Sequence, residues 1–133
     1  MTLSRDEPSS RPLLDKLGVK PGQKVSVLGL DDPSFLSQLH DRSADVTLRV
    51  RKGSDLIFFY MDDRRGLARL IEVRPSVKPN GAIWVLWRKG RKEFQEDDIR
   101  AFGPQAGLVD VKVVAFSATL SALKMVIPVA LRP

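Results

Sequence analysis

The stretch from Asp55 to Trp87 constrains the fold most. Residues 55–60 and 82–87 are apolar segments without polar/apolar alternation, a pattern typical of strands buried on both faces of a parallel sheet. Between them a helix is predicted from residue 64 to about residue 73, with Leu67, Leu70 and Ile71 on its buried side and Val73 or Val77 continuing that stripe. Parallel strands need a crossover of about a dozen residues, so the stretch predicts a right-handed βαβ unit in an open α/β sheet.

The segments before this unit predict a helix, a strand and a second helix. Residues 12–17 predict a short helix that ends at Gly18, and residues 24–30 predict the first strand. Asp32 can then cap a helix whose first residue is Pro33. Residues 78–81 (Lys-Pro-Asn-Gly) predict a turn before the strand at 82–87.

The β-prone run at residues 46–50 has two interpretations. The linker to the strand at 55–60 is too short to join the two as a parallel pair. The run is therefore either an antiparallel edge strand, or a strand after which the linker returns as coil. The positions of Arg49, Arg51 and Lys52 depend on which interpretation holds. In the helix at 64–73, the residues predicted to face water are Arg64, Arg65, Arg69 and Glu72.

The C-terminal part of the chain predicts a helix and a hairpin. Acidic residues at positions 96–98 favour the first turn of a helix. Residues 108–116 predict a strand near a sheet edge, and residues 122–127 return as its antiparallel partner, ending before Pro128. Trp84 and Trp87 differ in parity and should point to opposite faces of the sheet.

Composition limits the chemistry. The chain has 133 residues, which suits one domain at 12–133 preceded by a flexible polar tail at 1–11. It has no cysteine and one histidine, His40, so no metal site is expected and a histidine-based triad is a poor hypothesis. The sequence shows no apolar leader and no apolar run of membrane-spanning length, so we expect a cytoplasmic protein without a membrane partner. The net charge of +6 favours nucleic acid or another acidic partner.

The order of these segments resembles a shortened class I S-adenosylmethionine-dependent methyltransferase fold. Residues 78–87 and 107–113 are also similar to segments of a family of small bacterial proteins of unknown function, and the resemblance covers nearly all of residues 13–127. It implies a three-layer, Rossmann-like, mostly parallel sheet with a C-terminal antiparallel hairpin. The third strand and its helix would be missing between His40 and Ser54.

The resemblance also implies a degenerate cofactor site. Methyltransferases of this class carry an acidic residue two positions before the first glycine of the turn, where this chain has Val27. The next two glycines correspond to Asp31 and Pro33, and the acidic residue that binds the ribose falls in the missing span. No cofactor is therefore expected, with S-adenosylmethionine as the alternative, and no catalytic residue is assigned.

Candidate site residues follow the carboxyl ends of the strands, where open α/β sheets bind ligands. Gly29, Asp31, Asp32 and Asp62 are the candidate cofactor contacts, although helix capping also explains the aspartates. The two acids at the helix start disfavour a pyrophosphate there, but not a ligand with an amine or hydroxyls. Candidate anion or nucleic-acid contacts lie in the next loop, which is otherwise a solvated basic run: Arg88, Lys89, Arg91 and Lys92.

Three functional hypotheses follow. The first is a methyltransferase-like domain without methyltransferase activity that binds a small ligand or a macromolecular partner at the carboxyl ends of its strands. The second is an active methyltransferase that holds its cofactor in an unusual pose through Asp31 or Asp62. The third is a nucleic-acid-binding protein that uses the basic run after Trp87.

Overall fold

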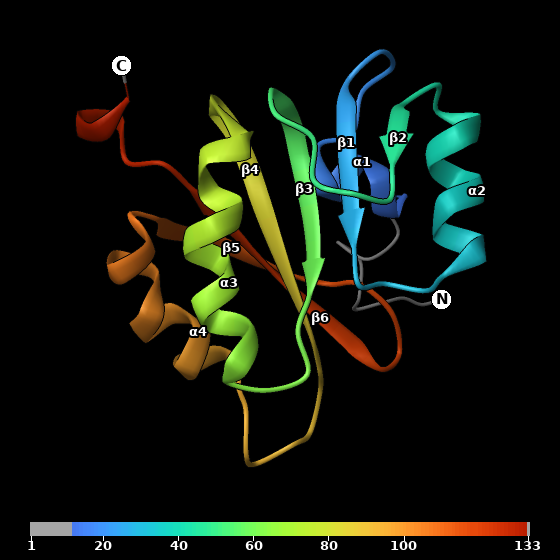
Figure 1. Ribbon diagram of the computed structural model, residues 1–133. Coiled ribbons are helices and arrows are strands. Elements are labelled where there is room, and N and C mark those ends of the chain that lie inside the picture. The colour runs from blue at the N-terminus through green and yellow to red at the C-terminus, as the bar shows by residue number, and fades with distance from the viewer. Residues whose placement is uncertain (1–11, 133) are drawn as a thin grey trace.

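A computed structural model describes residues 12–132, which form one sheet with helices on both faces (Figure 1). The predicted tail at 1–11 and Pro133 lie outside these residues. The strands are β1 (Lys24–Leu28), β2 (Asp45–Thr47), β3 (Ser54–Tyr60), β4 (Val77–Arg88), β5 (Val109–Ala115) and β6 (Leu120–Val126). Their order is β2-β1-β3-β4-β6-β5. The first four are parallel, and β6 runs antiparallel to both β4 and β5.

The helices divide the core into two layers. α1 (Leu13–Leu17) and α2 (Pro33–Asp41) pack on one face, while α3 (Arg65–Val73) and α4 (Glu96–Phe102) cover the other (Figure 1). The described residues also form short 3-10 helices: η2 (Arg74–Ser76), η3 (Gly103–Ala106) and η4 (Val129–Leu131). Trp84 belongs to the first layer and Trp87 to the second, which confirms their predicted opposite orientation. The three-layer α/β architecture is therefore as predicted.

The strand order reverses at β1. The chain leaves β1 through α2 and forms β2 on one side, then returns to form β3 on the other side of β1. The carboxyl ends of β1 and β3 therefore flank a topological switch point, the place where open α/β sheets bind ligands.

β2 resolves the direction that the sequence left open. It pairs in parallel with β1, and residues 48–53 then cross in front of β1 to the start of β3 (Figure 1). The interpretation with a returning linker is therefore correct. Within the described residues β2 is the edge strand, so the sheet lacks the third strand and helix of the longer fold, as the resemblance implied.

Two local predictions are wrong. Residues 78–81 belong to β4, which begins at Val77 and bulges there: Ser54 pairs with Val77 but Leu56 pairs with Ala82. Gly81 permits this because a Cβ at that position would lie 2.5 Å from the main-chain oxygen of Asp55. In α3 the buried stripe continues to Val73 as predicted, but Ile71 is 49% exposed, because at 3.6 residues per turn it lies about 100° around the helix from Leu70, the middle of the stripe.

The hairpin of β5 and β6 is confirmed. β5 forms the sheet edge opposite β2, and its valines at positions 109, 111 and 113 are exposed together with Lys112. No helix among residues 12–132 is both long and apolar enough to cross a membrane.

Candidate functional site

Gly29 brings the ends of β1 and β3 close together. Its φ of +74° lies in the left-handed region that favours glycine. A Cβ at this position would lie 3.3 Å from the main-chain oxygen of Tyr60, the last residue of β3. The backbone conformation therefore favours glycine here, and the close approach leaves little room for a side chain.

The two aspartates after Gly29 differ in their partners. Asp32 caps α2, since its Oδ1 accepts a hydrogen bond of 3.0 Å from the main-chain N–H of Phe35, and Pro33 follows as the first helical residue. Asp31 is exposed and makes no hydrogen bond or ion pair within residues 12–132. Only one of the two predicted carboxylates is thus available to a ligand.

Asp62 belongs to a polar network around Tyr60. The Tyr60 hydroxyl donates a hydrogen bond of 2.6 Å to Asp62 Oδ1, and Arg91 Nη1 lies 3.7 Å from the same oxygen. Burial raises the pKa of Tyr60, the bond to Asp62 raises it further, and Arg88 opposes both effects. The predicted residues Asp62, Arg88 and Arg91 therefore converge on a tyrosine that the sequence did not single out, although its place at the strand end was a usable signal.

The basic run after β4 is attached to the turn between β5 and β6. Lys89 donates from its main-chain N–H to Thr119 O and from its Nζ to Ser117 O, both at 2.9 Å. Lys92 is exposed and makes no ion pair in the described part of the chain. A hollow of about 360 Å³ lies beside this run, and Trp87 forms part of its wall.

A second hollow lies at the switch point itself, and we call it the switch-point hollow. It measures about 360 Å³ and is lined by Leu28, Gly29, Leu48, Arg49, Val50, Arg69, Glu72 and Val73. The guanidinium carbon of Arg69 lies 5.4 Å from the ring centroid of Phe59, a cation–π distance. Across residues 12–132 neither arginine forms an ion pair. The sequence singled out neither as a site residue. The place of Arg49 depended on the path after β2, and Arg69 was predicted to face water, which its exposed position confirms.

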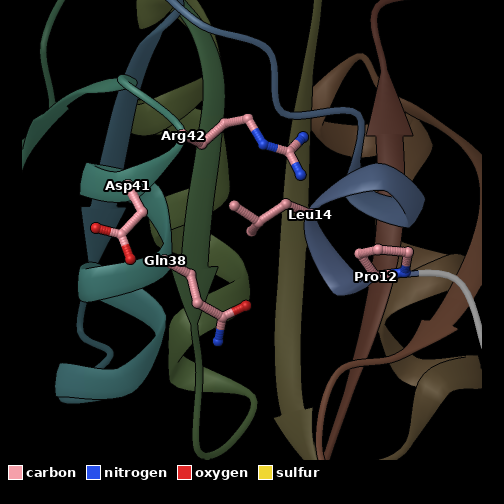
Figure 2. A pocket seen from close by; sticks show the side chains of 5 residues that line it. All are labelled: Pro12, Leu14, Gln38, Asp41 and Arg42. Atoms are coloured by element: carbon pink, nitrogen blue, oxygen red, sulfur yellow. The ribbon is translucent and has the colours of Figure 1, made fainter.

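A third hollow lies on the other face of the sheet, between α1 and α2 (Figure 2). It measures about 220 Å³ and is lined by Pro12, Leu14, Gln38, Asp41 and Arg42. Arg42 Nη1 donates to Val19 O at 2.8 Å and lies 3.0 Å from Asp15 Oδ1. Its charge is therefore already used to join the two helices, and none of the predicted site residues lies here.

The described residues contain no group of three or more histidine and acidic side chains that could hold a metal ion.

Comparisons with known proteins identify the fold. No protein-family model matches the sequence, and no curated protein matches it. A methyltransferase from Aquifex aeolicus, described as SAM-dependent, superposes with a TM-score of 0.66 at 16% identity, covering 91% of this chain and 89% of its own. A chain from the complex between the Haloferax volcanii Trm112 methyltransferase activator and a methyltransferase gives a TM-score of 0.65 at 12% identity. This match covers 87% of this chain and 86% of that chain. A TehB-like SAM-dependent methyltransferase from Corynebacterium glutamicum gives a TM-score of 0.57 at 13% identity, covering 86% of this chain and 84% of that chain.

These similarities cover most of the chain and concern its fold. The chain has a shortened, methyltransferase-like Rossmann fold, with a mostly parallel sheet closed by an antiparallel pair.

Proposed function

We propose that this protein is a methyltransferase-like binding domain that does not transfer methyl groups, and that its ligand presents anionic oxygens in the switch-point hollow. The observation that carries the proposal is the pair Arg49 and Arg69, two guanidinium groups without a carboxylate partner on the wall of this hollow. Guanidinium groups only donate hydrogen bonds, so a ligand that satisfies them must supply acceptors such as phosphate or carboxylate oxygens.

The residues present do not fit S-adenosylmethionine in the pose that the fold implies. This cofactor brings an ammonium group and ribose hydroxyls, which need hydrogen-bond acceptors, and a sulfonium cation, which nearby negative charge favours. Its carboxylate is the one group that the two arginines suit. Asp32 already caps α2, Asp62 accepts the Tyr60 hydroxyl, and Val27 is buried where an acid would be expected. Asp31 alone remains of the predicted acidic contacts. Glu72 is the one acid among the lining residues of the switch-point hollow, against two arginines.

The predicted obstacle to a pyrophosphate does not apply to this hollow. Asp31 and Asp32 lie at the start of α2, which packs on one face of the sheet, whereas the switch-point hollow borders α3 on the other. An anionic ligand there meets Arg49 and Arg69 rather than the acids at the helix start.

Thermal shift is the first experiment. A ligand raises the melting temperature only if it binds the folded state. We expect neither S-adenosylmethionine nor S-adenosylhomocysteine to bind, so the melting temperature should stay unchanged. A saturable rise would contradict this part of the proposal and favour an active enzyme with an unusual cofactor pose. In that case Asp31→Ala should abolish the rise without unfolding the protein, because Asp31 is the free carboxylate of the turn.

The second experiment tests the arginines. Adenosine diphosphate should raise the melting temperature saturably, whereas adenosine, which lacks the phosphates, should not. The double variant Arg49→Gln/Arg69→Gln should weaken the apparent affinity for adenosine diphosphate at least tenfold. Arg65→Gln is the matched control, since Arg65 lies on α3 but is 91% exposed and pairs with Asp63 outside the hollow. An equal loss in both variants would show that general charge, not this hollow, is responsible.

Nucleic-acid binding is a second candidate, favoured by the exposed Arg88 at the end of β4 and the exposed Lys92 in the loop after it. Binding of a single-stranded RNA oligonucleotide should then weaken steeply with salt. Replacing all four basic residues of the run, Arg88, Lys89, Arg91 and Lys92, with alanine should make that slope shallower. An unchanged slope would remove this candidate.

A further inference from the structure

The largest of the described hollows lies at the opposite edge of the sheet, where β3 and β4 begin, and we call it the amino-edge hollow. It measures about 440 Å³, within the range of small-molecule sites. The residues that matter for its chemistry are Lys20, Gln23, Asp55, Asn80, Lys124 and Arg132. None of them is a candidate residue of the carboxyl ends.

Two lysines face each other beside this hollow. Lys112 of β5 and Lys124 of β6 are direct partners in an antiparallel pair, so their side chains leave the sheet on the same face. Lys124 is half-buried next to the end of α1, whereas Lys112 is exposed. Burial lowers the pKa of Lys124, and the charge of Lys112 lowers it further. Like charges in this position destabilise a strand pair. An anion bound between the two lysines would offset their repulsion.

The chain itself does not supply that anion. In residues 12–132 no carboxylate pairs with Lys20, Lys112 or Lys124. The one acid that lines the hollow, Asp55, is occupied: its Oδ2 accepts the main-chain N–H of Lys24 at 2.8 Å, and its Oδ1 lies 3.0 Å from Lys78 Nζ.

The hollow also offers neutral donors. Gln23 Oε1 accepts a hydrogen bond of 2.8 Å from the main-chain N–H of Lys20, which leaves the side-chain amino group of Gln23 to donate elsewhere. Arg132 uses its Nε to bond Ile127 O at 2.9 Å, and its terminal nitrogens have no protein partner among the described residues.

We propose that the amino-edge hollow is a second binding site that takes a small phosphate-bearing ligand, held by Lys20, Lys124 and Arg132. The excess of unpaired donors over acceptors selects an anion with several oxygens. The concave shape and the half-buried position of Lys124 favour a small ligand over a polymer, which would contact exposed lysines on a convex surface. This site is independent of the function proposed for the switch-point hollow.

The experiment uses inorganic pyrophosphate as the probe and the melting temperature as the readout, with sodium chloride holding the ionic strength constant. The wild type should show a saturable rise. Lys124→Gln should weaken the apparent affinity at least tenfold, while its melting temperature without ligand should equal or exceed that of the wild type, because the repulsion with Lys112 is gone. Lys52→Gln is the matched control: Lys52 is exposed, lies outside the hollow and should leave the response intact.

Other outcomes overturn the proposal. The site is absent if the wild type shows no saturable rise, or if Lys124→Gln keeps the full response. If Arg49→Gln/Arg69→Gln removes the response instead, pyrophosphate binds only in the switch-point hollow, so this inference fails while the proposed function stands. If an RNA oligonucleotide binds through Lys124 and pyrophosphate does not, the ligand is a polymer and the inference again fails.

Discussion

Removing the Asp55 carboxylate should show how strongly the amino ends of three strands depend on one side chain. Asp55 is the second residue of β3, and it accepts the main-chain N–H of Lys24, the first residue of β1, at 2.8 Å. Its other oxygen lies 3.0 Å from Lys78 Nζ in the bulged start of β4. The variant Asp55→Ala therefore breaks the link between β1, β3 and β4 at once.

The magnitude follows from these two contacts. A hydrogen bond to a charged group contributes about 1.5–3 kcal/mol. The ion pair adds only about 0–1 kcal/mol, since the Lys78 side chain is 43% exposed. We therefore expect Asp55→Ala to lower the free energy of unfolding by about 2–3 kcal/mol, which lowers the melting temperature by roughly 10 °C in a domain of this size.

The effect should depend on pH. Burial alone would raise the pKa of Asp55, but the hydrogen bond from Lys24 and the ion pair with Lys78 outweigh it and lower the pKa below 3.8. A carboxylate with a lowered pKa contributes its full stability above the unfolded value and loses it as the pH falls through the folded value. The difference between wild type and Asp55→Ala should thus be constant near neutral pH and shrink below about pH 4.

Urea unfolding followed by tryptophan fluorescence measures both effects. Asp41→Ala is the control, because the Asp41 side chain is 80% exposed and its removal should change stability by less than about 0.5 kcal/mol. If Asp55→Ala behaves like this control, or if its effect is equally large in acid, the carboxylate does not hold the strands as argued.

Three further perturbations test other contacts. Tyr60 is the only tyrosine in the chain, so ultraviolet titration of its phenol should give a pKa above the ordinary 10.0, and Asp62→Ala should lower that pKa by removing the hydrogen-bond acceptor. Gly81→Ala should lower the free energy of unfolding in urea by about 1–3 kcal/mol, because the added Cβ collides with main-chain oxygen. Lys124→Met should raise it by about 0.2–1 kcal/mol at neutral pH. That gain should fade as the pH approaches 10.5, since the wild-type lysine, whose pKa is lowered, then loses its charge.

The sequence predicted those parts of the fold that local patterns determine. The continuous apolar runs at 55–60 and 82–87 gave two central parallel strands, because only strands covered on both faces can carry them. The parity of Trp84 and Trp87 placed them in different core layers, since side chains alternate along any strand. Asp32 and Pro33 marked the start of α2 because capping is a local interaction.

The predictions that failed depend on packing against distant segments. Ile71 lies at the border of the buried stripe of α3, and whether such a border residue is covered depends on what packs beside the helix, which periodicity does not fix. Lys-Pro-Asn-Gly reads as a turn by local rules, but residues 78–81 stay in β4 because the bare backbone of Gly81 fits against Asp55. For the candidate site, the sequence named Gly29 and Asp62 from their places at strand ends. That Tyr60 bonds to Asp62, and that Arg69 lines the same hollow as Gly29, emerges only from the three-dimensional arrangement.

The shortened sheet and the charge of its switch point have a common physical origin. Residues 48–53 make the connection from β2 to β3 and must cover the face of β1 without a helix. They do so through hydrogen bonds: the buried hydroxyls of Ser26 and Ser54 lie 2.8 Å apart, Arg51 N–H donates to Ser26 Oγ at 3.2 Å, and Ser54 Oγ donates to Arg51 O. The two serines thus satisfy the main-chain N–H and C=O of Arg51, which helps this segment to lie on β1 without unpaired polar groups. Its anchored path places Leu48, Arg49 and Val50 on the wall of the switch-point hollow. The connection that shortens the fold therefore also supplies one of the two guanidinium groups for which we propose an anionic ligand.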